Sequence, residues 1–427
     1  MPDFAAVIIE IINTGTELML GSVLNTHHQW LCRQLANWGY TVDRQVAIPD
    51  TGPAIREAVR EALSRADFII TTGGLGPTSD DLTRELIAGL LGRTLREDPG
   101  VLSHIEKFFA LRRRPMPARV RVQALVPEGA TVLPNQHGTA PGLLLEIPAA
   151  RFRKSDRASF LLMLPGPPRE LHPMFTDQVI PQLKEILPLA HPFASHTFKT
   201  TGLGESMIEE KISGPLQPLV RQGLEIGYCA KFGEVEVRLA ARGAEAEPLI
   251  RQGEDIVRRL LSKHIFGSKD EELEGVVIRL LAEREHTLAT AESCTGGYIS
   301  SSLTNVSGSS AAFLGGVVSY SNEAKQRFLH VKPETLDRHG AVSEDTAREM
   351  AEGIRQELNA TYGLAVTGIA GPAGGTLEKP VGTVFIALAG PTRTLVLHFL
   401  NPYDRATFKF MTSRQALDMV RRTVLSS

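Results

Sequence analysis

The sequence predicts an α/β protein in which buried strands alternate with amphipathic helices around largely parallel sheets. Short apolar runs recur along the chain, and polar turns rich in glycine follow them. Beyond each turn, apolar residues recur at helical spacing, which indicates an amphipathic helix. This alternation is typical of βαβ units, whose ligands bind beyond the carboxyl ends of the strands.

Length and composition predict a multidomain globular protein of ordinary charge. The chain has 427 residues, 42% hydrophobic and 22% charged, with a net charge of -2, so several domains and no nucleic-acid partner are expected. Three widely spaced cysteines offer neither a disulfide framework nor a zinc site. Without a signal peptide or an apolar run of about 20 residues, we expect a cytoplasmic protein that does not interact with membranes.

The first part of the chain shows the alternation clearly. We predict strands over residues 5–12, 41–48 and 67–70, with helices over residues 25–38, from residue 52 and over 82–91. Residues 100–126 are expected to be helical and basic, with Arg112 to Arg114 as a solvated helix end. Strands 143–147 and 160–164 should form a hairpin whose charged tip, 151–157, lies in water.

A glycine-rich turn after the third strand is the first candidate ligand loop. Its backbone amides could surround an anion, and the residues expected to do so are Gly73, Gly74, Gly76 and Thr78. Asp80 and Asp81 can either cap the next helix or hold a divalent cation beside a phosphate. Because Glu17 and Asp50 should lie at the same sheet edge, the four carboxylates are predicted to form a metal site.

The middle of the chain predicts a small α+β module. Strands are expected over residues 197–201 and 235–240, with helices over 204–212 and 248–261. The polar stretch 267–272 is expected to be a linker to the next helix, 273–285.

The stretch from Ala291 to Gly297 is the second candidate ligand loop, between a strand over 287–291 and a helix over 298–303. Either Ser293 or Thr295 simply caps that helix, or Ser293 is a nucleophile whose oxyanion the backbone amides of Thr295, Gly296 and Gly297 stabilise. Cys294 is a rival nucleophile.

A serine nucleophile needs a base, and Lys325 is the candidate. It follows a strand over residues 312–318 and the polar run Tyr320 to Asn322, which could hold it in position. His286 and His330 are expected to be surface residues rather than bases. The turn at Thr367 and Gly368 ends another apolar strand, so it should meet the same sheet edge.

These motifs resemble the CinA (competence/damage-inducible protein A) family over nearly the whole chain. The motifs that carry the resemblance are Gly15-Thr16-Glu17, Thr72 to Asp81, Gly138 to Gly142, Pro165-Gly166, Gly202 to Ser206, Ala291 to Gly297, Gly316 to Lys325, Gly340 to Ser343 and Thr367 to Pro372. The chain departs from the family at Asn25-Thr26-His27, where the family shows Asp-Thr-Asn.

The resemblance implies three domains with separate roles. Residues 1–175 would form a molybdopterin-binding-like domain, 176–266 a KH-like α+β domain, and 267–427 an α/β amidase domain. The first would hydrolyse ADP-ribose to AMP and ribose 5-phosphate with a divalent metal ion and potassium. Alternatively, it would bind a nucleotide or a pterin as a non-catalytic regulator, or carry molybdopterin.

For the third domain, the resemblance implies a nicotinamide-nucleotide amidase that needs no cofactor and acts in pyridine-nucleotide salvage. Ser293 would be its nucleophile, Lys325 the base and Tyr320 a positioning residue. Asn322, Thr367 and Gly368 would contact the substrate, and Arg405 would pair with the nucleotide phosphate. We expect small nucleotide substrates and a homo-oligomer, most simply a dimer.

Overall fold

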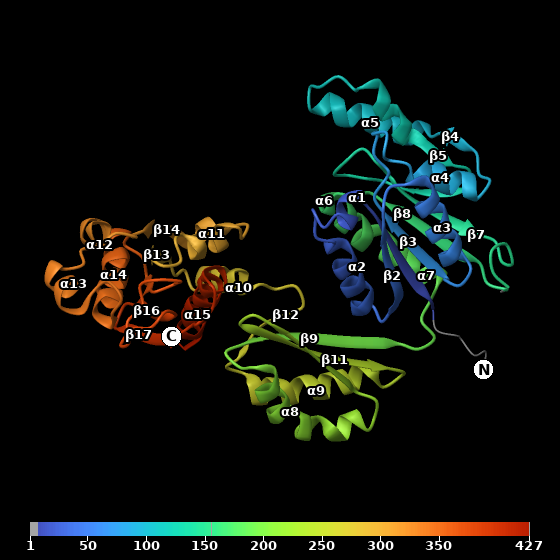
Figure 1. The fold of residues 1–427 in the computed structure, drawn as a ribbon. Coiled ribbons are helices and arrows are strands. Elements are labelled where there is room, and N and C mark those ends of the chain that lie inside the picture. The colour runs from blue at the N-terminus through green and yellow to red at the C-terminus, as the bar shows by residue number, and fades with distance from the viewer. Residues whose placement is uncertain (1–6, 155, 427) are drawn as a thin grey trace. The chain divides into compact units, whose positions relative to one another are not determined.

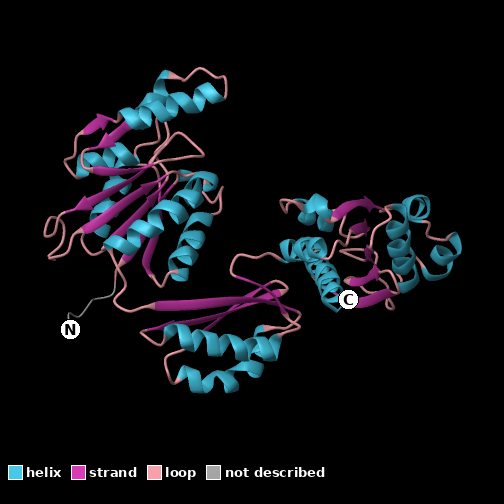
Figure 2. Cartoon of the chain, turned by 180° about the vertical axis from the view of Figure 1, so that it is seen from behind, coloured by secondary structure: helices cyan, strands magenta, loops and turns pink. Residues whose placement is uncertain are grey.

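The computed structural model describes residues 7–154 and 156–426. The chain divides into two compact units, residues Met1–Ala194 with Arg242–Ala244, and residues Ser195–Ala241 with Glu245–Ser427. Each unit has β-sheets with helices packed against them (Figures 1 and 2). Among the described residues, no helix is long and apolar enough to cross a bilayer.

The first unit contains the following elements. They are β1 (Ile9–Thr14), α1 (Thr16–Met19), α2 (Thr26–Asn37), β2 (Val42–Ile48), α3 (Gly52–Leu63), β3 (Phe68–Thr72), α4 (Thr83–Leu90), β4 (Leu95–Glu97), α5 (Pro99–Leu111), the 3-10 helix η1 (Ala118–Ala124), β5 (Leu125–Pro127), β6 (Ala130–Leu133), β7 (Gly142–Ile147), β8 (Ser159–Leu164), α6 (Pro168–Met174), the π-helical turn η2 (Phe175–Val179) and α7 (Ile180–Ile186).

Its main sheet has the order β2-β1-β3-β8-β7-β6. The pairs among β2, β1, β3 and β8 are parallel, as predicted, whereas β7 joins β8 and β6 in antiparallel pairs. Alternate residues of β1 pack into two hydrophobic cores, one on each face of the sheet, because successive strand residues point to opposite faces. Ile12 packs with α3 and α4, and Ile11 packs with α2 and α7. The carboxyl ends of β1, β3 and β8 therefore lie together between two helical layers.

Several predicted bounds in this unit were wrong. The strand predicted over 5–12 runs from Ile9 to Thr14, and residues 5 and 6 lie outside the described residues. The helix predicted over 100–126 ends at Leu111, and the 3-10 helix η1 follows. The hairpin is confirmed, but its tip is not wholly in water: Arg153 turns back and donates to Asp67 at 2.6 Å.

The second unit contains a four-stranded sheet and a five-stranded sheet. Its elements are β9 (Phe193–Thr201), which begins in the first unit, α8 (Glu205–Val220), β10 (Glu225–Lys231), β11 (Glu234–Arg242), α9 (Ala246–Leu261), β12 (Ile265–Ser268), α10 (Leu273–Glu283), β13 (Leu288–Glu292), α11 (Tyr298–Thr304), η3 (Ser309–Ala311), β14 (Phe313–Val318), α12 (Asn322–Leu329), α13 (Pro333–His339), α14 (Glu344–Glu357), β15 (Tyr362–Gly368), β16 (Thr383–Ala389), β17 (Thr394–Leu400) and α15 (Arg405–Ser426).

The four-stranded sheet has the order β10-β11-β9-β12. Strand β12 takes up part of the stretch 267–272 that was predicted to be a linker, so that prediction holds only for the residues after Ser268. Even there, Glu272 accepts a hydrogen bond from the buried Lys199 at 2.7 Å.

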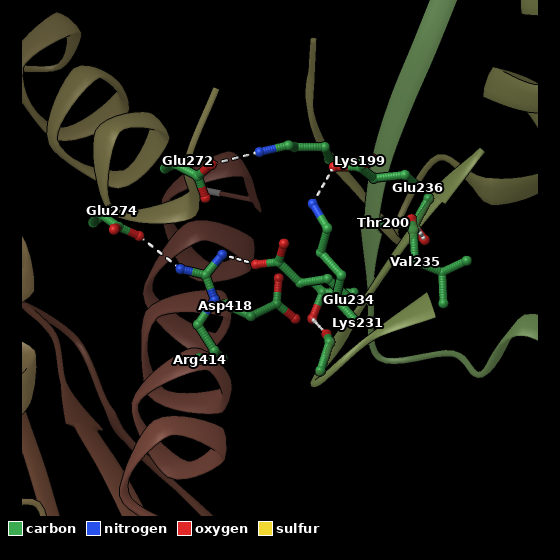
Figure 3. Close-up of polar contacts among 12 residues, drawn as sticks. Lys199, Thr200, Lys231, Glu234, Val235, Glu236, Glu272, Glu274, Arg414 and Asp418 are labelled. Atoms are coloured by element: carbon green, nitrogen blue, oxygen red, sulfur yellow. Dashed lines mark hydrogen bonds and ion pairs between the residues drawn. The ribbon is translucent and has the colours of Figure 1, made fainter. Parts of the chain in front are cut away.

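Buried ion pairs join this sheet to helices α10 and α15 (Figure 3). Arg414 of α15 pairs with Glu234 of β11 and with Glu274 at the start of α10. Burial lowers the pKa of Arg414 to about 10. Because a buried charge without a partner is costly, pairing with carboxylates offsets part of the cost of burying Arg414.

The five-stranded sheet has the order β14-β13-β15-β16-β17, with β14, β13 and β15 parallel. Helices α10, α11 and α15 cover one face, and α12, α13 and α14 cover the other. The second face carries small residues such as Ala291 and Ala365, which let α14 approach the sheet closely. Strands β14, β13 and β15 thus bring the loops after Val318, Glu292 and Gly368 to one edge.

Close packing on the α14 side predicts a large stability effect at Gly353. A Cβ atom there would lie 1.9 Å from the carbonyl oxygen of Leu329. We expect Gly353→Ala to lower the free energy of unfolding by about 3 kcal/mol, because overpacked helices must separate. Denaturant midpoints of the full chain measure this. Gly275→Ala in α10 is the matched control: no atom lies within 4 Å of its added methyl group, so a gain of about 0.5 kcal/mol is expected. Equal midpoints for the two variants would contradict the packing argument.

Candidate active site

In the first unit, a cavity of about 630 Å³ lies at the carboxyl ends of β1, β3 and β8. The cavity is lined by most of the residues predicted to form the site in this domain, namely Glu17, Asp50, Gly73, Gly74, Gly76, Asp80 and Asp81. Thr78 is not among its lining residues, but its amide and hydroxyl both donate to Asp81. The predicted residues therefore do converge on one cavity.

Close contacts explain the three glycines of the loop. A Cβ atom on Gly73 would lie 2.9 Å from the carbonyl oxygen of Thr14, and one on Gly74 would lie 2.0 Å from the hydroxyl of Thr83. Both residues also have positive φ, at 95° and 68°, which disfavours other residue types. At Gly76, the obstacle would be the carboxylate of Asp81 at 2.3 Å.

Two carboxylates of this cavity accept hydrogen bonds from neighbouring residues. Asp81 accepts from Thr78, and Asp50 accepts from the amide of Thr16 at 2.9 Å. Within the described ranges, no three His, Cys, Asp or Glu side chains lie close enough to hold a metal ion. The alternative capping interpretation of Asp80 and Asp81 was wrong, since the N-cap of α4 is Leu82 and no side chain caps that helix. Metal binding here stays a prediction.

Two polar atoms of the cavity lining lack partners. Gln123 is 3% exposed, and its Nε2 donates to the carbonyl oxygen of Leu75 at 3.3 Å, which leaves Oε1 buried without a donor. Nδ1 of His27 is also buried and unpaired, and desolvation lowers the pKa of this ring, which favours its neutral form. Buried polar atoms without partners are costly, so they indicate a ligand that forms hydrogen bonds with them. Sequence patterns did not single out Gln123, because it lies far along the chain from the loop.

In the second unit, Ser293 lies in the loop between β13 and α11. Its amide donates to the carbonyl oxygen of Val366 in β15 at 3.0 Å, and the residue is 8% exposed. The backbone beside the hydroxyl is thus anchored across the parallel sheet.

Lys325 approaches this hydroxyl from α12. Its Nζ donates to Ser293 Oγ at 3.1 Å and to the carbonyl oxygens of Ser319 at 2.9 Å and Tyr320 at 3.3 Å. Lys325 is 1% exposed, and desolvation lowers its pKa. Carbonyl oxygens can only accept hydrogen bonds, so two N–H groups stay committed to them. When the ammonium loses a proton, its lone pair therefore faces Ser293.

The helix after the loop is capped by Glu292, not by Ser293 or Thr295 as the alternative interpretation held. Its carboxylate, which is fully buried, accepts from the amides of Ile299 and Ser300 at 3.0 and 2.8 Å. The N-cap position is Gly297, with φ of 91°. The amide of Gly296 donates to the carbonyl oxygen of Ser293, so one of the three amides predicted to stabilise an oxyanion is already engaged.

Cys294 is poorly suited to be the nucleophile. Its side chain packs in the hydrophobic core beneath the loop, and burial raises its pKa to about 12. A thiol reacts as the thiolate, which is scarce at such a pKa.

The remaining residues predicted for this site make contacts of their own. The ring of Tyr320 is 62% exposed, and its hydroxyl accepts from Arg405 at 3.0 Å. The buried Thr367 donates to the carbonyl oxygen of Ala341 at 2.6 Å. Gly368 has no room for a side chain, because a Cβ atom would lie 2.7 Å from the carbonyl oxygen of Thr383. Asn322 is the exposed first residue of α12.

Of the two histidines expected at the surface, His330 is exposed and pairs with Glu357. The other expectation was wrong in part, because His286 is half-buried and contacts the ring of Tyr362. Sequence reasoning missed the roles of Glu292 and Ser319, although both flank predicted site residues.

Comparisons with known proteins cover nearly the whole chain. Family models match in order: a "Probable molybdopterin binding domain" over residues 10–185, a "Damage-inducible protein CinA KH domain" over 195–267 and a "CinA C-terminal domain" over 270–424. The three-part α/β architecture predicted from the sequence is thereby confirmed, while the domain boundaries stay predictions.

Full-length relatives are similar throughout. The chain is 43% identical to a CinA-like protein of Akkermansia muciniphila over 96% of this chain and 95% of that protein. It is 41% identical to one of Kosmotoga olearia over 97% and 98%. A crystal structure of a CinA superfamily protein from Klebsiella pneumoniae is 34% identical, covers 36% of this chain and 97% of that chain, and has a TM-score of 0.36.

Proposed function

Since the chain belongs to the CinA family, we propose that its C-terminal region is an amidase. It hydrolyses the carboxamide of nicotinamide mononucleotide to nicotinate mononucleotide and ammonia. The observation that carries this proposal is the 3.1 Å contact between Ser293 Oγ and the buried Lys325 Nζ. A serine paired with a lysine of lowered pKa is a working variant of the nucleophile–base arrangement.

The reaction follows an acyl-enzyme route. Lys325 takes the hydroxyl proton as Ser293 Oγ bonds to the carboxamide carbon, and the oxyanion is held by amides of Thr295 and Gly297. Lys325 returns the proton to the nitrogen, the C–N bond breaks and ammonia leaves. Water then attacks the ester, Lys325 accepts its proton, and the C–O bond to Ser293 breaks to release the nicotinate product and restore the serine. No cofactor is required by these steps.

Ammonia release by the full chain tests this function. The purified protein is incubated with nicotinamide mononucleotide, and both ammonia and nicotinate mononucleotide are measured. They should appear in equal amounts, because one carboxamide yields one of each. Unchanged substrate after long incubation would overturn the proposal, whereas ammonia from glutamine or asparagine instead would redirect it to another amide.

For the cavity of the first unit, we propose binding of ADP-ribose. The glycine loop lines the cavity where the pyrophosphate would bind, and the unpaired atoms Gln123 Oε1 and His27 Nδ1 can form hydrogen bonds with the sugar or base. Hydrolysis to AMP and ribose 5-phosphate, with a divalent metal ion and potassium, is the activity we propose. The alternative is a nucleotide- or pterin-binding regulator of the amidase.

The two roles differ in products. The full chain is incubated with ADP-ribose and magnesium or manganese, with and without potassium, and AMP is measured. AMP and ribose 5-phosphate in equal amounts support catalysis. Binding of ADP-ribose by calorimetry without any product supports the regulatory role, and tight co-purifying pterin would favour a carrier.

A further inference from the structure

A further carboxylate lines the cavity of the first unit, besides the four that were predicted there. Glu170 lies in the first turn of α6, is 8% exposed and belongs to the cavity wall. Its Oε2 accepts a hydrogen bond from Nδ2 of Asn135 at 2.8 Å. Its Oε1 lies 3.9 Å from Nε of the exposed Arg169, which is too long for a hydrogen bond. Oε1 is therefore the oxygen of Glu170 that can accept hydrogen bonds from a ligand.

The direction of this carboxylate is set by buried contacts. Asn135 is 3% exposed, its Nδ2 also donates to the carbonyl oxygen of Ala140 at 2.8 Å, and its Oδ1 accepts from the amide of His137 at 3.0 Å. Because turning the Asn135 amide would break buried hydrogen bonds, it is costly. A Cβ atom on Gly138 would lie 2.0 Å from Oε2 of Glu170, so this glycine leaves room for the carboxylate. Glu170 is thus held in one orientation.

The cavity wall also has an apolar part. Leu18, Val23 and Leu24 line the cavity, and the last two are 53% and 81% exposed. A flat base packs well on apolar side chains, whereas sugar hydroxyls need polar partners. Adenine therefore fits the apolar part of the wall. The terminal ribose of ADP-ribose is left with the polar part, to which Thr139 and Glu170 belong.

A fixed carboxylate distinguishes a sugar from a phosphate group. Carboxylate oxygens only accept hydrogen bonds, so Oε1 of Glu170 can bind ribose hydroxyls. The terminal phosphate of ADP is a monoester with about two negative charges near neutral pH, and in ADP-ribose the same phosphate is esterified to the ribose and carries less charge. Like charges at short range repel strongly in a partly buried site. Repulsion of the wrong ligand is one physical source of specificity.

We propose that Glu170 is a specificity-determining residue that selects ADP-ribose over ADP. Its Oε1 accepts hydrogen bonds from the hydroxyls of the terminal ribose and disfavours a terminal phosphate in that position. This inference rests on the proposed binding of ADP-ribose in this cavity, but it does not depend on hydrolysis. Binding in the presence of EDTA tests it, because removal of divalent metal ions separates a contact with the ribose from coordination of a metal ion.

The experiment is calorimetry of the full chain with ADP-ribose and with ADP, for the wild type and for Glu170→Gln. Because Asn135 Nδ2 needs an acceptor, the glutamine oxygen stays on the Asn135 side, and an uncharged N–H group replaces Oε1. We expect Kd for ADP-ribose to rise about tenfold, the scale of one lost charge-assisted hydrogen bond. Kd for ADP should not rise, since the repulsion is removed. Glu185→Gln is the matched control, because Glu185 is an exposed residue of α7 outside the cavity wall, and it should behave as the wild type.

Gly138→Ala is a second variant, which keeps every charge of the protein. Its methyl group must displace the Glu170 carboxylate, so the affinity for ADP-ribose should fall in this variant too. Circular dichroism verifies that both variants are folded.

Three results would refute the inference. Equal weakening of both ligands in Glu170→Gln would place Glu170 beside the adenosine half, unchanged affinities would leave it a structural residue, and an effect that appears only with magnesium in place of EDTA would make it a metal ligand. If the wild type binds neither ligand, the proposed function fails, and this inference fails with it. If the wild type binds ADP-ribose but forms no AMP, only the proposed hydrolysis fails, and the two affinities still decide the role of Glu170.

Discussion

Replacing Ser293 with alanine should lower kcat for ammonia release by at least about 10⁴-fold, because losing a nucleophile that acts together with its base removes the whole covalent route. The change removes only the hydroxyl oxygen of an 8% exposed side chain, so the fold should persist. The Lys325 ammonium would lose one of three acceptors but keep the carbonyl oxygens of Ser319 and Tyr320. Initial rates of ammonia formation, with circular dichroism to verify folding, measure the effect.

Cys294→Ala is the control for this result. The cysteine is adjacent to the nucleophile, lies in the same loop and differs from alanine by one sulfur atom. Because its thiol is buried in the core with a pKa raised to about 12, we expect kcat within about threefold of the wild type and a small loss of stability. Full activity in Ser293→Ala together with an inactive Cys294→Ala would exchange the two assignments.

Much of the Ser293 site could be predicted because it depends on local patterns at strand ends. The turns after β13, β14 and β15 are each recognisable from an apolar run followed by polar and glycine residues. Parallel strands bring those turns to one edge without further information. Ser293 and Lys325, 32 residues apart, therefore meet at 3.1 Å as expected.

Other features depend on contacts that no local pattern encodes. Glu292 is adjacent to Ser293 in the sequence. Its role as the cap of α11 could not be predicted, because it depends on the Glu292 side chain reaching the amide of Ile299, seven residues later. The stretch 267–272 was polar enough to suggest a linker, yet Ile265 to Ser268 forms an edge strand with β9, some 70 residues earlier. Long-range strand pairing of this kind overrides local propensity.

The N-terminal cavity shows the same limit. Convergence of Glu17, Asp50, Asp80 and Asp81 at one sheet edge was predictable from strand order. The direction of these side chains could not be predicted in the same way, because it is set by hydrogen bonds such as those from Thr78 to Asp81. Shared location is therefore weaker evidence for a metal site than a measured ligand geometry.

Lys325→Met should lower kcat for ammonia release by about 10³-fold, the contribution of a well-placed general base. In the wild type, only the neutral amine can accept the proton of Ser293, so kcat/KM should rise with pH and then level off. Desolvation lowers the pKa of Lys325 below its ordinary value of 10.5, so the midpoint of this rise should lie below 10.5. The residual activity of Lys325→Met should lack that rise, and Lys325→Arg should be as inactive, since a guanidinium does not deprotonate in this range.

Stability provides an independent check on the same group. Because the folded state lowers the pKa of Lys325, the unfolded chain binds more protons between the lowered pKa and 10.5, and the lysine's contribution to the free energy of unfolding increases with pH across that window. Below this pH window, Lys325 is buried as an ammonium ion, which lowers the free energy of unfolding relative to the neutral amine. Denaturant unfolding at several pH values should show this increase in the wild type and its loss in Lys325→Met. A pH–rate rise that persists in Lys325→Met would assign the base to another residue, whereas loss of both pH effects would tie the catalytic proton to this buried amine.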